Sequence, residues 1–153
     1  MSPEDALKLK NRKEGFEDFF NELMPVLVDF IEKIGITPAH QVLKHVEQYV
    51  PLVEKALQDM VVTDNVERVW LLTRMSYFVG EYFSQKYEGC WYVSEIYESR
   101  YFSRYVVGQF SKKKNLLAMI DPFEIAKDYV DSPIPRKLTE LLFEVDKELD
   151  VIE

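Results

Sequence analysis

Hydrophobic positions between residues 65 and 87 recur at helical spacing on three faces rather than on one. A helix that is hydrophobic on nearly every side is typically surrounded by other elements. Asp64, with Glu67 three residues later, forms a capping box that begins such a helix, and Gly89 is a natural stop. The pattern therefore predicts a central, enclosed helix over residues 65–87. The side chains expected to be largely buried are those of Trp70, Val79 and Phe83.

Upstream of this stretch, hydrophobic residues recur every three or four positions and predict amphipathic helices. Ser2 as N-cap and Pro3 in the first turn begin the first of them. We expect Gly15 to separate a short first helix from a longer one, Pro25 to kink or split the longer one, and Gly35 to end it.

Residues 38–60 repeat the same kind of helix start, with Thr37 as N-cap and Pro38 at the first position. Their hydrophobic stripe is interrupted at Pro51, so we expect either one broken helix or two short ones. The whole N-terminal half is thus predicted to be helical.

The pattern changes after Gly89, where aromatic and β-branched residues become frequent. Consecutive strands with short connections form an antiparallel meander. The sequence predicts three strands, over residues 90–97, 101–110 and 116–120, with turns at 98–100 and 111–115.

Two helices are predicted after these strands. Asp121 as N-cap, followed by a proline and by Glu124 in the first turn, begins a helix that ends near Ser132. The stripe of the last helix covers residues 138–149. Helices, then strands, then helices, without βαβ alternation, indicate the α+β class. No linker or repeat divides the chain, so a single domain over residues 1–153 is expected.

Charge is distributed unevenly along the chain. Of the formal net charge of −8, residues 1–89 contribute −5, residues 90–120 contribute +3 and residues 121–153 contribute −6. An acidic chain argues against broad nucleic-acid binding, which requires a basic face. It favours a basic protein partner. The simpler explanation, that acidic charge keeps a small protein soluble, stays open.

Composition also bears on the compartment. No segment approaches the ~20 hydrophobic residues that span a bilayer, and the N-terminus lacks the hydrophobic region of a signal peptide. A single cysteine cannot form an internal disulfide, and nothing points to an oxidising compartment. We therefore expect a cytoplasmic protein that does not bind membranes.

Residues with obvious catalytic or metal-binding chemistry are few. His40 and His45 are five positions apart, which matches no metal motif, and structural histidines are the expected interpretation. Cys90 begins a hydrophobic strand with no base near it in sequence, so we expect a buried core thiol. The sequence predicts no catalytic residue, no cofactor and no metal site.

The most informative polar position in the central helix is Glu81. The glycine before it costs about 1 kcal/mol relative to alanine, which suggests close packing at Gly80. A carboxylate on an enclosed helix requires a partner, and Arg104 in the second predicted strand is the first candidate for a buried polar pair. Alternatively, Glu81 acts in a small-molecule or catalytic pocket together with Trp91 and Tyr105.

Two surfaces are candidates for interaction with a partner. The predicted hairpin carries Arg100, Tyr101 and Tyr105, residue types that are enriched at binding hot spots. Aromatic residues beside the lysines at 112–114 would also suit single-stranded nucleic acid, although a lysine triplet in a turn is more often a solvated loop. The second surface is the acidic face of the last helix, with Glu140, Glu144 and Glu148.

Three short motifs recur together in this chain: a helix ending in Gly-Glu, a Gly-x-Trp that opens a strand, and a Pro-Phe helix start. They are Gly80–Glu81, Gly89–Cys90–Trp91 and Asp121–Pro122–Phe123. In these motifs the chain, over about residues 65–130, resembles a group of small bacterial α+β domains of unknown biochemical function. The resemblance implies a non-enzymatic domain, and similar small acidic proteins occur as immunity proteins that neutralise toxins.

Three hypotheses of function follow, in order of preference. The first is a non-enzymatic protein-interaction protein, for example an immunity-type inhibitor of a basic partner, that uses the sheet and the acidic helices. The second is a small-molecule binder or enzyme with a pocket around Glu81, Trp91 and Tyr105. The third is nucleic-acid binding through the basic aromatic hairpin, which the net charge opposes.

Overall fold

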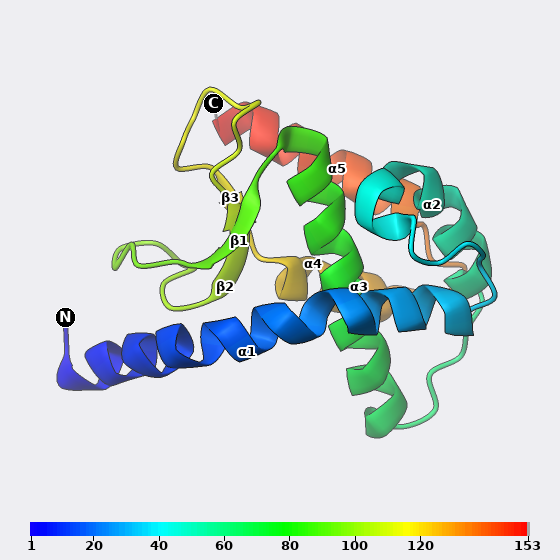
Figure 1. Ribbon diagram of the computed structural model, residues 1–153, viewed down its shortest axis with the longest axis horizontal. Coiled ribbons are helices and arrows are strands. Elements are labelled where there is room, and N and C mark those ends of the chain that lie inside the picture. Colours follow the sequence, from blue (N-terminus) through cyan, green and yellow to red (C-terminus); the bar gives the residue numbers. More distant parts are fainter. Residues whose placement is uncertain (153) are drawn as a thin grey trace.

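The computed structural model describes residues 1–152 and confirms the α+β class, with helices, sheet and helices in the predicted order (Figure 1). Within these residues, three helices precede an antiparallel sheet of three strands and two helices follow it. The elements are α1 (Pro3–Lys33), α2 (Val42–Leu57), α3 (Asn65–Tyr87), β1 (Cys90–Val93), β2 (Tyr105–Gly108), β3 (Met119–Ile120), α4 (Pro122–Val130) and α5 (Leu138–Ile152).

Helix α1 is continuous over 31 residues, so the predicted break at Gly15 is wrong. Ser2 caps the helix by accepting a hydrogen bond from the backbone amide three residues later, at 3.0 Å. Gly15 instead marks a close approach, because a Cβ there would lie 3.0 Å from the hydroxyl oxygen of Tyr105. Pro25 lies inside the helix and does not split it, since the hydrophobic residues on both sides of it pack into the core.

Helix α2 contains the break predicted for this region, but at His45 rather than at Pro51. His45 has φ −133° and ψ 43°, outside the helical range. The side-chain amide of Gln85 on α3 satisfies the backbone groups there: its Oε1 accepts from Val46 N at 3.0 Å, and its Nε2 donates to the Val42 carbonyl at 2.9 Å. The kink is therefore stabilised by a contact with α3, which no local pattern reveals.

Helix α3 is the central helix, with α1, α2, α4, β1 and β2 packed around it (Figure 1). Every residue over 75–83 is buried, and Val79 and Phe83 are buried as predicted. The first turns project beyond the core: Val66 is 79% exposed and Trp70 is only partly buried. Enclosure was thus correctly predicted for the later part of the helix and wrongly for its beginning.

The sheet has the order β1–β2–β3 and is antiparallel throughout, as predicted, but its strands are shorter than expected. Cys90 pairs with Gly108 and Val93 with Tyr105 across β1 and β2. Strand β3 contains only two residues, and the leucines just before it, which were expected in the strand, are exposed.

Residues 94–104 form a loop, which corrects the prediction that β1 and β2 extend through most of this region. Two backbone hydrogen bonds close its base, from Ser94 N to Arg104 O at 3.0 Å and from Ser103 N to Ser94 O at 2.8 Å. The left-handed conformation of Ser103 (φ 62°) turns the chain away from a straight strand. Tyr101 therefore lies in a turn, beyond the strand ends.

The central helix and the sheet meet at Gly80 and Trp91. A Cβ at Gly80 would lie 1.9 Å from the indole ring of Trp91, so the close packing predicted for this glycine is confirmed. The indole is buried and also contacts Phe19 and Phe123, with ring centroids 5.2 and 6.3 Å away. This cluster fixes the sheet and α1 against α3.

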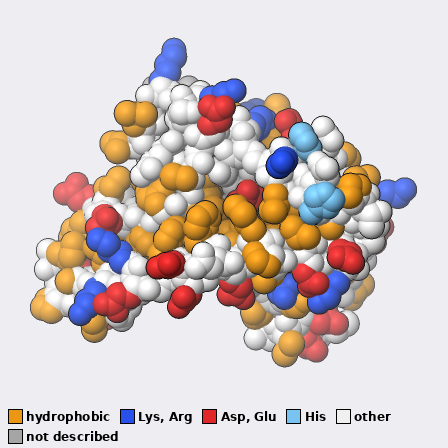
Figure 2. All heavy atoms as spheres, viewed as in Figure 1, with side chains coloured by type: hydrophobic (Ala, Val, Ile, Leu, Met, Phe, Trp, Pro, Cys, Tyr) orange, Lys and Arg blue, Asp and Glu red, His pale blue; other side chains and the backbone are white. Residues whose placement is uncertain are grey.

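The surface is not uniformly polar. Figure 2 shows hydrophobic side chains gathered across the middle of one face, over α1 and the region above it, with charged side chains mostly around them. Within residues 1–152, no helix combines the length and the hydrophobicity needed to cross a membrane.

Candidate functional site

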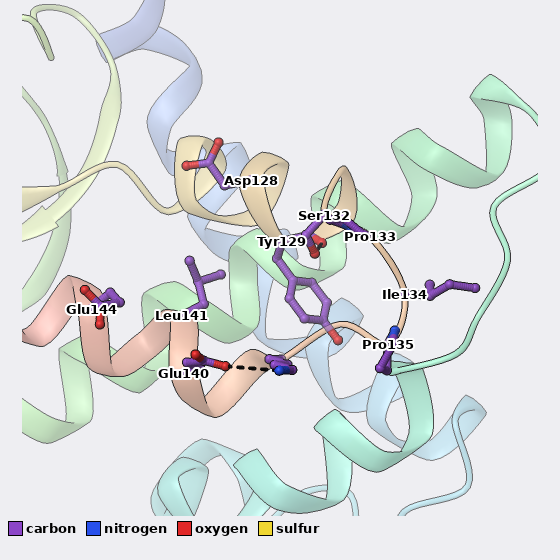
Figure 3. A pocket seen from close by; sticks show the side chains of 10 residues that line it. Asp128, Tyr129, Ser132, Pro133, Ile134, Pro135, Glu140, Leu141 and Glu144 are labelled. Carbon is purple, nitrogen blue, oxygen red and sulfur yellow. Dashed lines mark hydrogen bonds and ion pairs between the residues drawn. The ribbon is translucent and has the colours of Figure 1, made fainter.

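A groove of about 510 Å³ lies between α4, α5 and the loop 131–137 that joins them (Figure 3). We call it the α4–α5 groove. Its floor and wall are hydrophobic. They are formed by Tyr129, Pro133, Ile134, Pro135 and Leu141.

Tyr129 is the most deeply placed of these side chains. It is 1% exposed, and its ring extends from α4 toward the loop at Pro135 (Figure 3). Burial raises the pKa of Tyr129 to about 12; the charge of Arg136 opposes this shift and the carboxylate of Glu54 adds to it. Its hydroxyl has no hydrogen-bond partner among the described residues. The floor of the groove is therefore uncharged at neutral pH.

Carboxylates border the groove on both helices. Asp128 lies on α4, and Glu140 and Glu144 lie one turn apart on α5 (Figure 3). One cation, Lys137, is also part of the rim, and its amino group lies 3.9 Å from Glu140. Both members of this ion pair are well exposed, and such pairs contribute little to stability, so they separate easily when a partner binds. The rim carries a net negative charge.

A buried arginine holds the loop wall in place. Arg136 is buried, and its guanidinium donates to three backbone carbonyls: Leu57 O at 3.1 Å, Met60 O at 2.7 Å and Val130 O at 3.3 Å. Leu57 is the last residue of α2, where the helix dipole favours a positive charge. The guanidinium also lies 6.0 Å from the centre of the Tyr129 ring. These contacts fix the loop between α4 and α5 to the end of α2.

Two further interactions fix the ends of the flanking helices. Glu54 on α2 accepts hydrogen bonds from Thr139 N and Oγ1, both at 3.1 Å, and so satisfies a free amide in the first turn of α5. Arg68 on α3 donates two hydrogen bonds to Asp131 after α4, at 2.9 and 2.7 Å. The groove is therefore largely formed before any partner binds.

The structure brings together two of the three acidic residues predicted for the interaction surface. Glu140 and Glu144 line the groove, whereas Glu148 lies one turn further along α5. There it borders a separate pocket of about 260 Å³, together with Arg100 and Tyr101 from the loop 94–104. The predicted hairpin and helix surfaces thus meet at Glu148.

The predicted hairpin residues already make contacts within the chain. Arg100 pairs with Glu124 at 3.0 Å and lies over the ring of Tyr101, 4.6 Å from its centre. Tyr105 is half-buried under α1, and its hydroxyl donates to the Arg12 carbonyl at 2.8 Å. The hairpin therefore contributes less accessible surface than its sequence suggests.

The predicted pair of Glu81 with Arg104 is wrong. Arg104 pairs with Asp121 at 3.0 Å, because it lies at the start of β2 beside the first turn of α4. Glu81 is buried on the face of α3 that carries Gln85. Burial raises the pKa of Glu81, and the polar groups of Gln85 and Trp91 oppose this only in part. The Trp91 indole N–H lacks a hydrogen bond of normal geometry, so its stabilisation of the carboxylate is weak.

Glu81 should make stability depend on pH. Because its folded-state pKa is raised, ionisation opposes folding. The free-energy cost of burying the ionised carboxylate is absent at a pH below the unfolded-state pKa. It grows as the pH rises from the unfolded-state pKa to the folded-state pKa, and it reaches its full value above the folded-state pKa. We expect Glu81→Gln to be more stable than the native protein at pH 7, and equal to it near about pH 4. Urea denaturation across this range measures the difference.

The control for this experiment is Glu17→Gln, which removes an exposed carboxylate on α1 and should leave the pH dependence of unfolding unchanged. A Glu81→Gln variant that is less stable than the native protein at pH 7 would contradict the assignment, since the ionised carboxylate would then be favoured by its surroundings.

Other polar residues also differ from expectation. Cys90 is exposed rather than buried in the core, and its thiol donates to Gln109 at 3.3 Å. Partial burial raises the pKa of the thiol, so it is not an activated thiolate. Lys113 is buried instead of solvated: it pairs with Asp150 and lies 4.3 Å from the centre of the Tyr87 ring.

Histidines do not form a metal site with other ligands. His40 and His45 are both exposed, and among the described residues no three His, Cys, Asp or Glu side chains converge.

Sequence reasoning missed the hydrophobic part of the groove. The sequence pattern at Pro133–Ile134–Pro135 was interpreted only as the entry to the last helix. An isoleucine between two prolines in a short connection also indicates a stiff, outward-facing segment. Ile134 is 50% exposed. The role of Arg136 depends on carbonyls some 80 positions away in sequence and leaves no local signal.

No known protein family, curated protein or solved structure matches this chain, so its function has to be argued from its own residues and geometry.

Proposed function

We propose that the protein binds a basic partner protein through the α4–α5 groove and the adjoining acidic face of α5. The partner supplies a hydrophobic side chain that enters the groove and lysines or arginines on either side of it that meet the carboxylates. The observation that carries the proposal is the combination of a preformed hydrophobic floor with an acidic rim at Asp128, Glu140 and Glu144.

The floor explains how affinity arises. A volume of about 510 Å³ has room for a large hydrophobic side chain and part of its neighbour. Burying hydrophobic surface contributes roughly 25 cal/mol per Å², and a preformed site avoids the entropic cost of ordering a loop. Because Arg136 and Glu54 already hold the groove open, most of the free energy gained by burying hydrophobic surface contributes to the affinity for the partner.

The rim explains which partners are favoured. Residues 121–153 carry a net charge of −6 within a chain of −8. Such a field accelerates association with a basic protein and rejects acidic ones, more than it sets the final affinity. An immunity-type inhibitor that neutralises a basic toxin is one concrete form of this proposal.

Nucleic-acid binding through the hairpin has less support. The basic residues of that region are already engaged by carboxylates within the chain: Arg100 with Glu124, Arg104 with Asp121, and Lys113 with Asp150. Phosphates would have to displace these carboxylates, and the net charge of the protein repels them.

The proposal is tested with a synthetic peptide in which a Leu-Phe pair is flanked on each side by two lysines. We expect Glu140→Gln, Glu144→Gln and Glu148→Gln together to lower the association rate about 3–10-fold at low salt and to flatten its salt dependence. The dissociation rate should change less, because these carboxylates lie at the rim. Stopped-flow fluorescence with a labelled peptide measures both rates.

A matched control removes the same number of charges elsewhere: Glu17→Gln, Glu22→Gln and Glu32→Gln on α1, all exposed. This control should slow association much less. If the α5 variant and the control have equal effects, the acidic rim has no specific role and only net charge matters. If association is indifferent to salt and to both sets of substitutions, the proposal is wrong.

A further inference from the structure

A second cavity, separate from the α4–α5 groove, lies between α1, α3, β2 and the start of α4. It has a volume of about 390 Å³ and shares no lining residue with the groove. Four aromatic side chains form its walls, and we call it the aromatic pocket. They are Phe19, Tyr77, Tyr105 and Phe123.

The rings of this pocket are arranged around Phe19. Tyr105 stacks on Phe19 with centroids 4.5 Å apart and an angle of 28° between the planes. Phe123 and Tyr77 lie 6.0 and 5.8 Å from Phe19, at 44° and 71°. The pocket thus offers both ring faces and ring edges, which are the surfaces that a flat aromatic ligand contacts favourably.

One hydroxyl in this pocket is accessible and makes no hydrogen bond within the described residues. Tyr77 is 4% exposed, and its hydroxyl makes no hydrogen bond with any residue over 1–152. Burial raises the pKa of Tyr77 and the nearby carboxylate of Glu22 raises it further, so the hydroxyl keeps its proton and is a donor. A ligand that places an acceptor beside this hydroxyl would therefore gain a hydrogen bond without breaking one inside the protein.

One cation at this pocket is also uncompensated. The guanidinium of Arg12 lies over the Tyr105 ring, 5.6 Å from its centre, and pairs with no carboxylate of the described residues. The other arginine of the pocket, Arg104, is held by Asp121 at 3.0 Å and by Glu124 at 3.2 Å. Among the charged residues that line the pocket, Arg12 is therefore the one whose charge is not paired within the described residues.

The N-terminal half of α1 is fixed over the pocket. The hydroxyl of Tyr105 donates to the Arg12 carbonyl at 2.8 Å. Further out, Lys13 pairs with Glu95 at 3.1 Å, and the Tyr97 hydroxyl donates to a carboxylate near the start of α1 at 3.0 Å. Arg12 is thus held beside the opening before any ligand arrives.

From the rings, the lone hydroxyl and the unpaired guanidinium, the geometry points to a binding site for a small aromatic acid. The flat ring of the ligand lies among Phe19, Tyr105 and Phe123, and its carboxylate accepts from Arg12 and from Tyr77. Of the three residues expected around a ligand pocket, only Tyr105 lines this one: Trp91 packs behind Phe19, and Glu81 lies outside the lining. This site is independent of the proposed partner surface on α5.

The test uses 2-naphthoate and its uncharged analogue 2-naphthamide, with binding measured by calorimetry and mapped by ¹H–¹⁵N NMR of the full chain. We expect saturable binding of naphthoate with shifts at residues 12, 19, 105 and 123. Naphthamide should bind about fivefold more weakly, because it lacks the carboxylate that pairs with Arg12. A difference in affinity of this size is usual for one partly exposed ion pair. Arg12→Gln should remove this preference and leave naphthamide binding unchanged.

Two variants keep the result interpretable. Tyr77→Phe keeps the ring, so it should weaken naphthoate binding about threefold or more without lowering the melting temperature, because it removes a hydroxyl that has no partner. Lys10→Gln, an exposed cation nearby on α1, should leave both affinities unchanged. The proposal is overturned if naphthoate does not bind saturably, if its shifts map elsewhere, or if Arg12→Gln and Lys10→Gln have the same effect.

Discussion

Replacing Phe83 by alanine is expected to lower the free energy of unfolding by about 3–5 kcal/mol. Phe83 is fully buried one turn before the C-terminal end of α3 and packs beside Tyr82 and Tyr87, with ring centroids 4.9 and 6.3 Å away. Every residue of α3 from 75 to 83 is buried, and α1, α2, α4, β1 and β2 contact this helix, so the structure cannot easily collapse into the cavity that the substitution leaves. Urea or guanidinium denaturation measures the loss.

A control on the same helix separates burial from helix propensity. Val66→Ala removes a side chain that is 79% exposed and should change the free energy of unfolding by less than about 0.5 kcal/mol. A loss below about 1 kcal/mol for Phe83→Ala would mean that the core is not organised around α3.

Replacing Arg136 by methionine is expected to lower the free energy of unfolding by about 2–4 kcal/mol. Methionine has a similar length but cannot donate to the carbonyls of Leu57, Met60 and Val130, and each hydrogen bond from a charged donor contributes about 1.5–3 kcal/mol. Some of this loss is offset, because the substitution also removes the cost of burying a charge. The loop wall of the groove should loosen, which amide hydrogen exchange over residues 131–137 detects.

The neighbouring Lys137→Met tests whether the effect depends on the buried position. Lys137 is well exposed and pairs only loosely with Glu140, so its loss should change stability by less than about 0.5 kcal/mol. Arg136→Lys keeps the charge but loses the planar fork, and should lie between the native protein and Arg136→Met. Equal stability of the native protein and Arg136→Met would show that the loop is not held by this side chain.

The helices were predictable where their signals are local. The start of α3 is the clearest case: Asp64 accepts from Glu67 N at 2.8 Å, and Glu67 in turn accepts from the preceding Thr63 N at 2.8 Å. These contacts connect residues three or four positions apart, so the sequence alone specifies them. The same holds for the Asp121 cap of α4, which accepts from the amides of the two residues after the proline.

The lengths of the strands were not predictable from the same kind of pattern. Aromatic and β-branched residues over 94–104 favour a strand locally, yet the loop is set by contacts with distant parts of the chain. Tyr97 donates to Asp5 on α1, and Glu95 pairs with Lys13. Because these contacts join positions more than 80 residues apart, a window of ten residues carries no information about them.

The candidate sites show the same limit. The burial of Glu81 could be predicted from its place in an enclosed helix. Its partner could not be predicted, because the direction in which Arg104 points depends on how β2 meets α4. The acidic face of α5 was visible as a spacing of four between Glu140 and Glu144. The hydrophobic floor beside it was not, since Tyr129 and Leu141 come from two helices whose packing is a tertiary property.

The most direct test of the central claim is a ¹H–¹⁵N NMR titration of the chain over residues 1–153 with the lysine-flanked Leu-Phe peptide. If the α4–α5 groove is the binding site, the amides of Ser132, Ile134, Glu140, Leu141 and Glu144 should shift together and saturate at one peptide per chain. The same peptide with glutamate in place of lysine should cause no such shifts, because the rim is acidic. Shifts confined to the loop 94–104, or no saturable shifts with the lysine peptide, would contradict the proposal that the groove binds a basic partner.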